Sequence, residues 1–220
     1  LGSLTKLIQE QPEELVWHNQ HVRHSRTVFC QKIWLEWVQK AAQWIDLVHS
    51  VQPERLKMAL HSLEQFQLLC STNQQVERAN HEGLAMLWGD HRPMNGDLPH
   101  GCPIIVQSNS EVLSLSNGDV GIAIGKQLGG TAMFGLFESE EATPRLIPLT
   151  QLPLHRPAFG LTIHKSQGSE WEHVAIELPE SSGSRILSKN LLYTAITRSS
   201  SRVTLFGETL VLQELVEGKD

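Results

Sequence analysis

The stretch Gly160-Leu-Thr-Ile-His-Lys-Ser-Gln-Gly-Ser-Glu170 joins an apolar strand end to a polar loop. The loop offers hydroxyl groups, a histidine ring, a lysine charge and backbone amides that Gly168 leaves accessible. Hydroxyls, amides and cations are the groups that hold the phosphate backbone of a nucleic acid. The stretch therefore predicts a site for a phosphate-rich ligand, although a solvated loop between two elements of an α/β fold can have the same composition.

A second motif, Leu191-Leu-Tyr-Thr-Ala-Ile-Thr-Arg198, follows within the same part of the chain. It predicts a helix that turns Leu192, Ala195 and Ile196 inward and places an arginine near its carboxyl end. Such an arginine can simply satisfy the last carbonyl groups of its helix. It can also act as an arginine finger that stabilises the charge on a γ-phosphate. The occurrence of both motifs in one short span favours the second interpretation.

The residues around these two motifs predict an α/β fold. Strands are expected at 159–163, 173–178 and 202–207, and helices at 190–199 and 208–216. The apolar run Phe66–Cys70 predicts one more buried strand, which leads into a helical pattern. This alternation of strands and helices is typical of a sheet covered by helices.

Two other regions have different patterns. Residues 1–65 contain apolar side chains at three- and four-residue intervals between Val28 and Val48, which predicts a helical segment. Residues 96–157 contain four short β-rich runs separated by turn residues such as Asn117-Gly118, which predicts a small antiparallel β-barrel. We therefore expect an α/β core formed by residues 66–95 and 158–220, with the barrel inserted into it and the helical segment packed on it.

The composition is that of an ordinary globular protein, because 40% of the 220 residues are apolar and a chain of this length can bury a core. The net charge of −6 argues against a protein that coats nucleic acid by bulk electrostatics, so any DNA contact has to be local. Cys30, Cys70 and Cys102 are far apart and suggest neither disulfides nor a zinc site. The sequence has no membrane span and no signal peptide, so we expect a cytoplasmic protein without a membrane partner.

Two parts of an ATP-hydrolysing site are missing from these residues. The segment Gly121–Lys126 is one residue shorter than a phosphate-binding P-loop and falls in a β-rich run. No Asp-Glu pair follows an apolar strand to hold Mg²⁺. His18, His21 and His24 recur every three residues, but a solvated helix face explains them better than a metal site does. We therefore expect no metal ligands, no cofactor bound by this chain alone and no independent ATP hydrolysis.

The sequence also resembles a known family. Thr162–Pro179 and Leu191–Ser199 resemble motifs V and VI of superfamily 1 DNA helicases, and the spelling His-Lys-Ser-Gln-Gly-Ser-Glu is most similar to the RecD (exonuclease V alpha subunit) branch. Asn117–Ile124 resembles part of a Src-homology-like barrel in RecD, and Leu63–Cys70 resembles the strand that enters motif IV. The resemblance covers most of residues 63–207. It implies a RecA-like second helicase domain, of the P-loop NTPase type, with a small antiparallel β-barrel inserted.

The resemblance carries over to individual residues. It implies that Thr162, His164 and Ser166 are DNA-binding residues that face the backbone of the single strand. It implies that Gly168 and Glu170 are ATP-binding residues, and that Glu170 reaches the ribose.

Arg198 has a catalytic and ATP-binding role in the same comparison, where it contacts the γ-phosphate with support from Tyr193 and Thr197. Core packing explains Tyr193 equally well. Family members also carry an arginine soon after the motif IV strand, whereas here that strand leads into Ser71–Gly83, where Arg78 is the nearest arginine. The sequence leaves open whether Arg78 replaces this second phosphate-sensing arginine.

The resemblance implies the second motor domain of an ATP-dependent 5′–3′ DNA helicase that acts in double-strand break repair and recombination. A motor domain preceding Leu1 would hold ATP and Mg²⁺, and the partners would be single-stranded DNA, duplex ends and RecB and RecC type subunits. The alternative is a non-catalytic DNA- or subunit-binding module that retains helicase motifs. A P-loop and an Asp-Glu motif encoded upstream of Leu1 would favour the enzyme, and a native start at Leu1 would favour the module.

Overall fold

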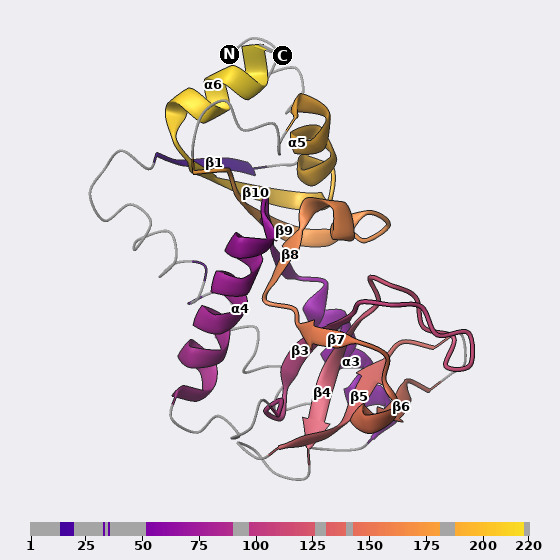
Figure 1. Ribbon diagram of the computed structural model, residues 1–220. Helices are drawn as coiled ribbons and strands as arrows, with labels where there is room; N and C mark the ends of the chain where they lie inside the picture. Colours follow the sequence, from indigo (N-terminus) through magenta and orange to yellow (C-terminus); the bar gives the residue numbers. More distant parts are fainter. Residues whose placement is uncertain are drawn as a thin grey trace. The chain divides into compact units, whose positions relative to one another are not determined.

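The structure is a computed structural model that describes residues 14–19, 33, 35, 52–89, 97–125, 131–139, 143–180 and 188–217 (Figure 1). The chain divides into two compact units. The first unit contains Leu1–Glu36, Glu64–Arg78 and Gly160–Asp220, and the second contains Trp37–Leu63 and Ala79–Phe159. Most of the second unit therefore lies between two segments of the first in the sequence.

The first unit is built on a parallel sheet with the strand order β1-β10-β9-β2-β8. All neighbouring strands in this sheet run parallel. The strand bounds are Glu14–Asn19 for β1, Phe66–Cys70 for β2, Gly160–Thr162 for β8, Trp171–Glu177 for β9 and Ser199–Gly207 for β10. The inner strands are almost continuously buried, as expected for a parallel sheet covered on both faces. The sequence prediction of an α/β fold is confirmed.

Helices connect or follow these strands at the predicted places. Helix α4 (Asn73–Trp88) follows β2, helix α5 (Lys189–Ile196) connects β9 to β10, and helix α6 (Thr209–Glu217) follows β10. Helix α5 buries Leu192, Ala195 and Ile196, which are the side chains that its spacing predicts to face inward.

The strand β1 contradicts part of the predicted helical segment at residues 1–65. Glu14–Asn19 pairs in parallel with β10, from Glu14 opposite Arg202 to Asn19 opposite Gly207. The strand is stabilised by hydrogen bonds to residues far away in the sequence, which local apolar spacing cannot reveal. Helix α3 (Pro53–Leu63) and the helical positions Ile33 and Leu35 do agree with the prediction. Other residues of this segment, including Trp34, Trp37 and Trp44, lie outside the described residues.

The second unit contains an antiparallel sheet with the strand order β6-β5-β4-β3-β7. The strand bounds are Cys102–Val106 for β3, Val120–Gly125 for β4, Ala132–Phe137 for β5, Arg145–Pro148 for β6 and His155–Pro157 for β7. A 3₁₀ turn, η2 (Leu149–Gln151), connects β6 to β7. The predicted β-rich region is confirmed, and β7 is a strand that the sequence did not predict. Strands β6 and β7 stand at the two ends of the sheet order, so the described pairings are those of a sheet and not of a closed barrel.

The cysteines in the described residues are buried. Cys70 lies at the end of β2 and Cys102 at the start of β3, and neither forms a disulfide. Burial raises the pKa of the Cys102 thiol, so this thiol stays protonated and unreactive. Cys30 lies outside the described residues. Within the described part of the chain, no helix is long and apolar enough to cross a membrane.

Gly83 allows a close approach inside the second unit. A Cβ at this position would overlap Cγ of Phe159, whose side chain is fully buried. The Phe159 ring also packs edge-on against Trp88, with 6.2 Å between ring centroids. Its backbone N–H donates to Oδ1 of Asn80 at 2.9 Å. Since the ring is fully buried and its backbone is hydrogen-bonded, it has little room to move away from a larger residue at position 83.

We predict that Gly83→Ala destabilises the protein by about 1–3 kcal/mol through overpacking, despite the helix propensity of alanine. Chemical denaturation would measure the change, and Glu77→Ala on an exposed position of the same helix is the matched control. The cost should become smaller when Gly83→Ala is measured in a Phe159→Leu background. A stabilising effect of Gly83→Ala would contradict the close approach.

Candidate functional site

The polar loop quoted above connects two parallel strands of the first unit. Strand β8 ends at Thr162, the 3₁₀ turn η3 covers Ile163–Ser166, and β9 begins at Trp171. Gly168 has a φ angle of +92°, and nothing lies within 4 Å of the place where its Cβ would be. The backbone conformation, and not close packing, therefore favours glycine at this position.

The predicted ligand-binding side chains of this loop differ in exposure. Thr162 is half-buried, whereas His164, Gly168 and Glu170 are exposed. Ser166 is fully buried, and its Oγ donates to the carbonyl oxygen of Ile163 at 2.7 Å. The sequence predicts Ser166 as a DNA contact, but in the structure its hydroxyl has an internal acceptor and closes the 3₁₀ turn.

Helix α5 brings the second motif to the same loop. Ser188 begins the helix, and its Oγ accepts a hydrogen bond from the backbone N–H of Leu191 at 3.2 Å. Arg198 follows the carboxyl end of the helix, where its Nε donates to the carbonyl oxygen of Thr194 at 3.2 Å. Its Nη1 donates to the carbonyl oxygen of Ser169 in the loop at 3.3 Å. The guanidinium therefore contacts the end of its own helix and also joins the two motifs.

A backbone contact fixes the two motifs further. The N–H of Trp171, the first residue of β9, donates to the carbonyl oxygen of Arg198 at 2.8 Å. The 3₁₀ turn η3 also packs against α5. The loop and the arginine therefore form one structural unit.

Tyr193 and Thr197 were predicted to support Arg198. Tyr193 is 45% exposed, so packing in the core does not explain this residue. Thr197 Oγ1 donates to the carbonyl oxygen of Thr194 at 3.0 Å, which is also the acceptor of Arg198 Nε. The shared acceptor relates Thr197 to the arginine, whereas a supporting role for either side chain stays a prediction.

Comparison with known proteins agrees with these motifs. Residues 157–206 match the UvrD-like helicase C-terminal domain. The RecBCD enzyme subunit RecD of Haemophilus influenzae is 32% identical over 161 residues, which cover 70% of this chain and 23% of that protein. The RecBCD enzyme subunit RecD of Mycolicibacterium smegmatis is 34% identical over 170 residues, which cover 72% of this chain and 28% of that protein. The chain is related to the C-terminal region of RecD, a superfamily 1 helicase subunit. The resemblance predicted from the sequence is thus confirmed.

The chain spans only 23% and 28% of the length of these two curated relatives. Among solved structures, the Pif1 helicase from Candida albicans aligns with a TM-score of 0.46 at 16% identity, covering 79% of this chain and 54% of that chain. The relationship to RecD rests on the sequence matches.

The RecD-type motifs reach two opposite edges of the parallel sheet. At the carboxyl edge, where the strands end, Thr162 is in register with Cys70, and Cys70 is in register with Glu177. At the amino edge, where β9 and β10 begin, Trp171 is in register with Ser199, the residue after Arg198. The seven residues of β9 separate the two edges by about 20 Å at roughly 3.3 Å per residue. The loop from Ile163 to Glu170 therefore runs from one edge to the other.

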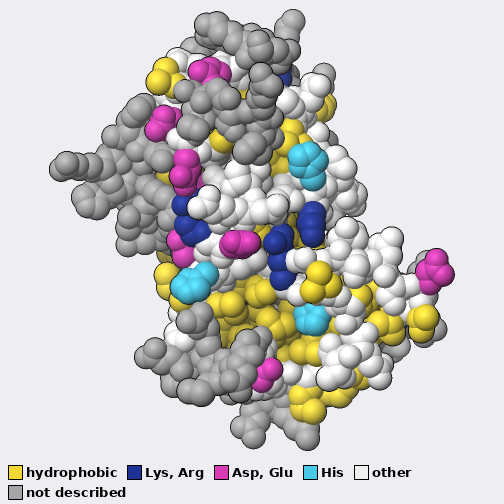
Figure 2. Space-filling model, in the orientation of Figure 1, with side chains coloured by type: hydrophobic (Ala, Val, Ile, Leu, Met, Phe, Trp, Pro, Cys, Tyr) yellow, Lys and Arg dark blue, Asp and Glu magenta, His cyan; other side chains and the backbone are white. Residues whose placement is uncertain are grey.

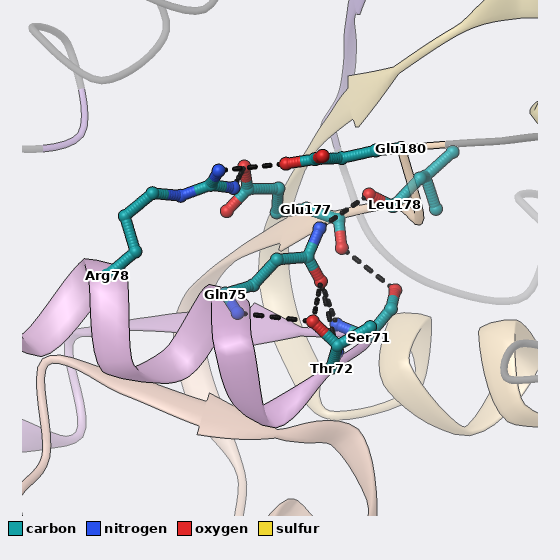
Figure 3. A network of polar contacts seen from close by, with 7 residues as sticks. All are labelled: Ser71, Thr72, Gln75, Arg78, Glu177, Leu178 and Glu180. Carbon is teal, nitrogen blue, oxygen red and sulfur yellow. Dashed lines mark hydrogen bonds and ion pairs between the residues drawn. The ribbon is translucent and has the colours of Figure 1, made fainter.

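A polar network at the carboxyl edge was not predicted from the sequence (Figure 3). The backbone N–H of Gln75 donates to Thr72 Oγ1 at 3.1 Å, and Gln75 Oε1 accepts from the backbone N–H of Thr72 at 3.0 Å. This reciprocal pair is a capping box at the start of α4. Gln75 Nε2 also donates to the carbonyl oxygen of Leu178 at 2.8 Å, and Ser71 Oγ donates to that of Glu177 at 2.9 Å. The beginning of α4 is thereby tied to the end of β9.

Arg78 extends from α4 to the same edge and forms two ion pairs (Figure 3). Its Nη2 lies 2.8 Å from Oε1 of Glu177, and its Nη1 lies 2.8 Å from Oε1 of Glu180. The side chain of Glu177 is 5% exposed and that of Glu180 is 63% exposed, while that of Arg78 is 32% exposed. One ion pair is thus largely buried and the other faces solvent.

The position of Arg78 along strand β9 differs from that of Arg198. Arg78 contacts Glu177 at the carboxyl end of β9, whereas Arg198 contacts Trp171 at the amino end. The two arginines therefore contact opposite ends of this strand. The Thr-Asn-Gln-Gln spelling at 72–75 was the sequence signal for the capping box, but no local pattern pairs Arg78 with Glu177.

The other predicted sites have plain outcomes. No group of three or more metal-ligating side chains occurs among the described residues. The side chains of His18, His21 and His24 lie outside the described residues. Gly121–Gly125 belongs to the antiparallel strand β4 and not to a strand-to-helix loop, whereas Lys126 lies outside the described residues.

We predict that Arg78→Ala lowers the free energy of unfolding by about 1–3 kcal/mol, because it removes the guanidinium from a buried carboxylate. Glu180→Gln should change stability by less than about 1 kcal/mol, since that carboxylate is mostly solvated. Adding Glu177→Gln to Arg78→Ala should restore part of the loss, and urea denaturation would measure all of these changes. Equal effects of Arg78→Ala and Glu180→Gln would contradict the unequal burial of the two ion pairs.

Proposed function

We propose that this chain is the second motor domain part of an ATP-dependent 5′–3′ DNA helicase of the RecD type, acting in double-strand break repair and recombination. The observation that supports it most strongly is the contact between Arg198 and the loop at Ser169. It joins the residue proposed for the γ-phosphate to the segment proposed for DNA.

In this proposal, residues 66–95 and 158–220 form a RecA-like core, and residues 96–157 form an inserted Src-homology-like barrel. Within residues 1–65, strand β1 belongs to the sheet of this core. The antiparallel pairing of neighbouring strands and the 3₁₀ turn before β7 support this assignment, while β6 and β7 are the two ends of the described sheet. Closure of this sheet into a barrel would require β6 to pair with β7.

The proposed DNA contacts lie where the loop leaves β8. Thr162 and His164 face the backbone of the single strand, while Ser166 holds the turn that presents them. The face in Figure 2 supports a local contact, because the Lys and Arg side chains on its described residues are few and lie among acidic ones. A chain with a net charge of −6 has to concentrate its phosphate contacts in this way.

The proposed nucleotide contacts lie at the amino edge. Gly168 and Glu170 lie by the nucleotide, and Arg198 reaches the γ-phosphate of ATP, which is held with Mg²⁺ by a preceding motor domain. The two hydrogen bonds of the Arg198 guanidinium measure 3.2 and 3.3 Å and end on neutral carbonyl oxygens. A phosphate oxygen is a stronger acceptor that forms shorter bonds, so it would replace them readily. The donors present therefore fit a nucleotide phosphate.

Movement of Arg198 towards a phosphate would break its hydrogen bond to the carbonyl oxygen of Ser169. The loop between the two edges could then change its conformation. The loop also carries His164, five positions before Ser169, so a change at the nucleotide would reach the DNA contact through this short loop. Closure and opening of the two motor domains would then move the protein along the single strand. In the cytoplasm, RecB and RecC type subunits and duplex DNA ends would be its partners.

The arginine role is testable in the full-length protein. We expect Arg198→Ala to lower kcat for ATP hydrolysis by about 10³ or more, the effect of losing an arginine finger. Lys189→Ala removes a cation from the opposite end of the same helix and should leave kcat near the wild-type value. Steady-state ATPase assays decide the matter, and unchanged hydrolysis by the Arg198 variant would exclude the role.

The DNA contact is tested separately. His164→Ala should reduce the stimulation of ATP hydrolysis by single-stranded DNA and leave the DNA-independent rate unchanged, because the ring faces the strand and not the nucleotide. His81→Ala, an exposed histidine on α4, is the control. Stimulation that is the same in the His164 variant and the wild type would count against the contact.

A further inference from the structure

We propose that Arg78 is a phosphate contact for the single strand at the carboxyl edge and that Glu180 is an internal competitor, which occupies the guanidinium when no strand is bound. The proposal rests on the DNA contact proposed for Thr162. It assigns Arg78 to DNA and not to the nucleotide.

The register of the sheet supports this location. Thr162, Cys70 and Glu177 occupy one row across three neighbouring strands. Adjacent strands are about 4.8 Å apart, so the Cα atoms of Thr162 and Glu177 are separated by roughly 10 Å. Side chains at these two positions could therefore contact consecutive phosphates of one DNA strand. Arg78 reaches this row through its ion pair with Glu177.

The two carboxylates hold the guanidinium in different ways. Glu177 is buried at the end of β9 and orients Nη2, while Glu180 is mostly exposed and contacts Nη1. An exposed ion pair contributes little to stability, because water screens it and both side chains lose freedom. A phosphate forms charge-assisted, bidentate bonds with arginine and can displace such a carboxylate. Glu177 would keep the guanidinium oriented during the exchange.

The base of Arg78 is rigid. The capping box of Thr72 and Gln75 fixes the first turn of α4, and Gln75 connects that turn to Leu178, between the two acidic residues. Because Glu177 also holds Nη2, the guanidinium is already positioned before a ligand arrives, which lowers the entropic cost of binding.

The charge of the cluster accounts for the competition. Two carboxylates and one guanidinium leave a local charge of about −1, which repels a phosphate. Removing the charge of Glu180 makes the cluster neutral and leaves Nη1 available for the strand. Glu180 would therefore weaken DNA binding in the wild-type protein.

The test uses the full-length protein and fluorescence anisotropy with a labelled oligothymidylate. Glu180→Gln should tighten binding up to about fivefold, the range of an exposed ion pair. Glu172→Gln removes the same charge from an exposed position near the other end of β9 and should have no comparable effect. Equal gains from both substitutions would mean that only net charge matters, and would overturn the proposal.

The second arm removes the arginine without leaving a buried charge. Arg78→Gln combined with Glu177→Gln should weaken binding about tenfold, as expected for a lost hydrogen-bonded charge, and reduce the slope of log K against log salt by about 0.7. In this background, Glu180→Gln should no longer tighten binding. A persisting gain there would show that Glu180 does not act through Arg78 and would overturn the proposal.

His164→Ala distinguishes this proposal from the function on which it rests. In one outcome, the wild-type protein binds the oligonucleotide and His164→Ala weakens this binding, while the Glu180 and Arg78 variants bind as the wild type does. In that case only the role of Arg78 fails. If the wild-type protein does not bind the oligonucleotide, the proposed DNA contact fails and the role of Arg78 fails with it.

Discussion

The hydrogen bonding of strand β9 is the interaction on which the site depends. β9 pairs with β2 on one side and β10 on the other, so each end of β9 determines what lies beside it. At its beginning, the bond from Trp171 N–H to the Arg198 carbonyl holds the arginine motif against the polar loop. At its end, Glu177 meets Arg78 and Ser71. The two edges are separated by a strand that is buried along nearly its whole length, and they can therefore carry different ligands.

The loop between β8 and β9 is a covalent connection between these edges. It is short, and its 3₁₀ turn is held by Ser166 from within. Gly168 gives it a backbone conformation that other residues adopt only with strain. A loop with this construction transmits displacement better than a long flexible connection would. In the proposed function, this loop would relate the state of a nucleotide to the contact with DNA.

The net charge of the chain limits how the proposed site can contact phosphates. The chain carries a net charge of −6, so contact with a polyanion has to come from a few arranged groups. In the structure, Arg78 is held by carboxylates and Arg198 by carbonyl oxygens, and no acidic partner is recorded for Arg198 among the described hydrogen bonds and ion pairs. The two arginines thus differ in what a phosphate would have to displace. This difference follows from their positions at opposite ends of β9.

The sequence by itself determined the α/β class, the buried strand at 66–70, the inward face of α5 and the relationship to RecD. These depend on local spacing and on residue types that a short motif displays. Only the tertiary structure decided that Glu14–Asn19 is a strand, that the Ser166 hydroxyl turns inward and that Arg78 pairs with Glu177. The strand and the ion pair join residues far apart in the sequence, and the Ser166 hydroxyl is enclosed by the fold around its turn. Local pattern carries no information on such partners, since hydrogen bonds and ion pairs form between whichever groups the fold brings together.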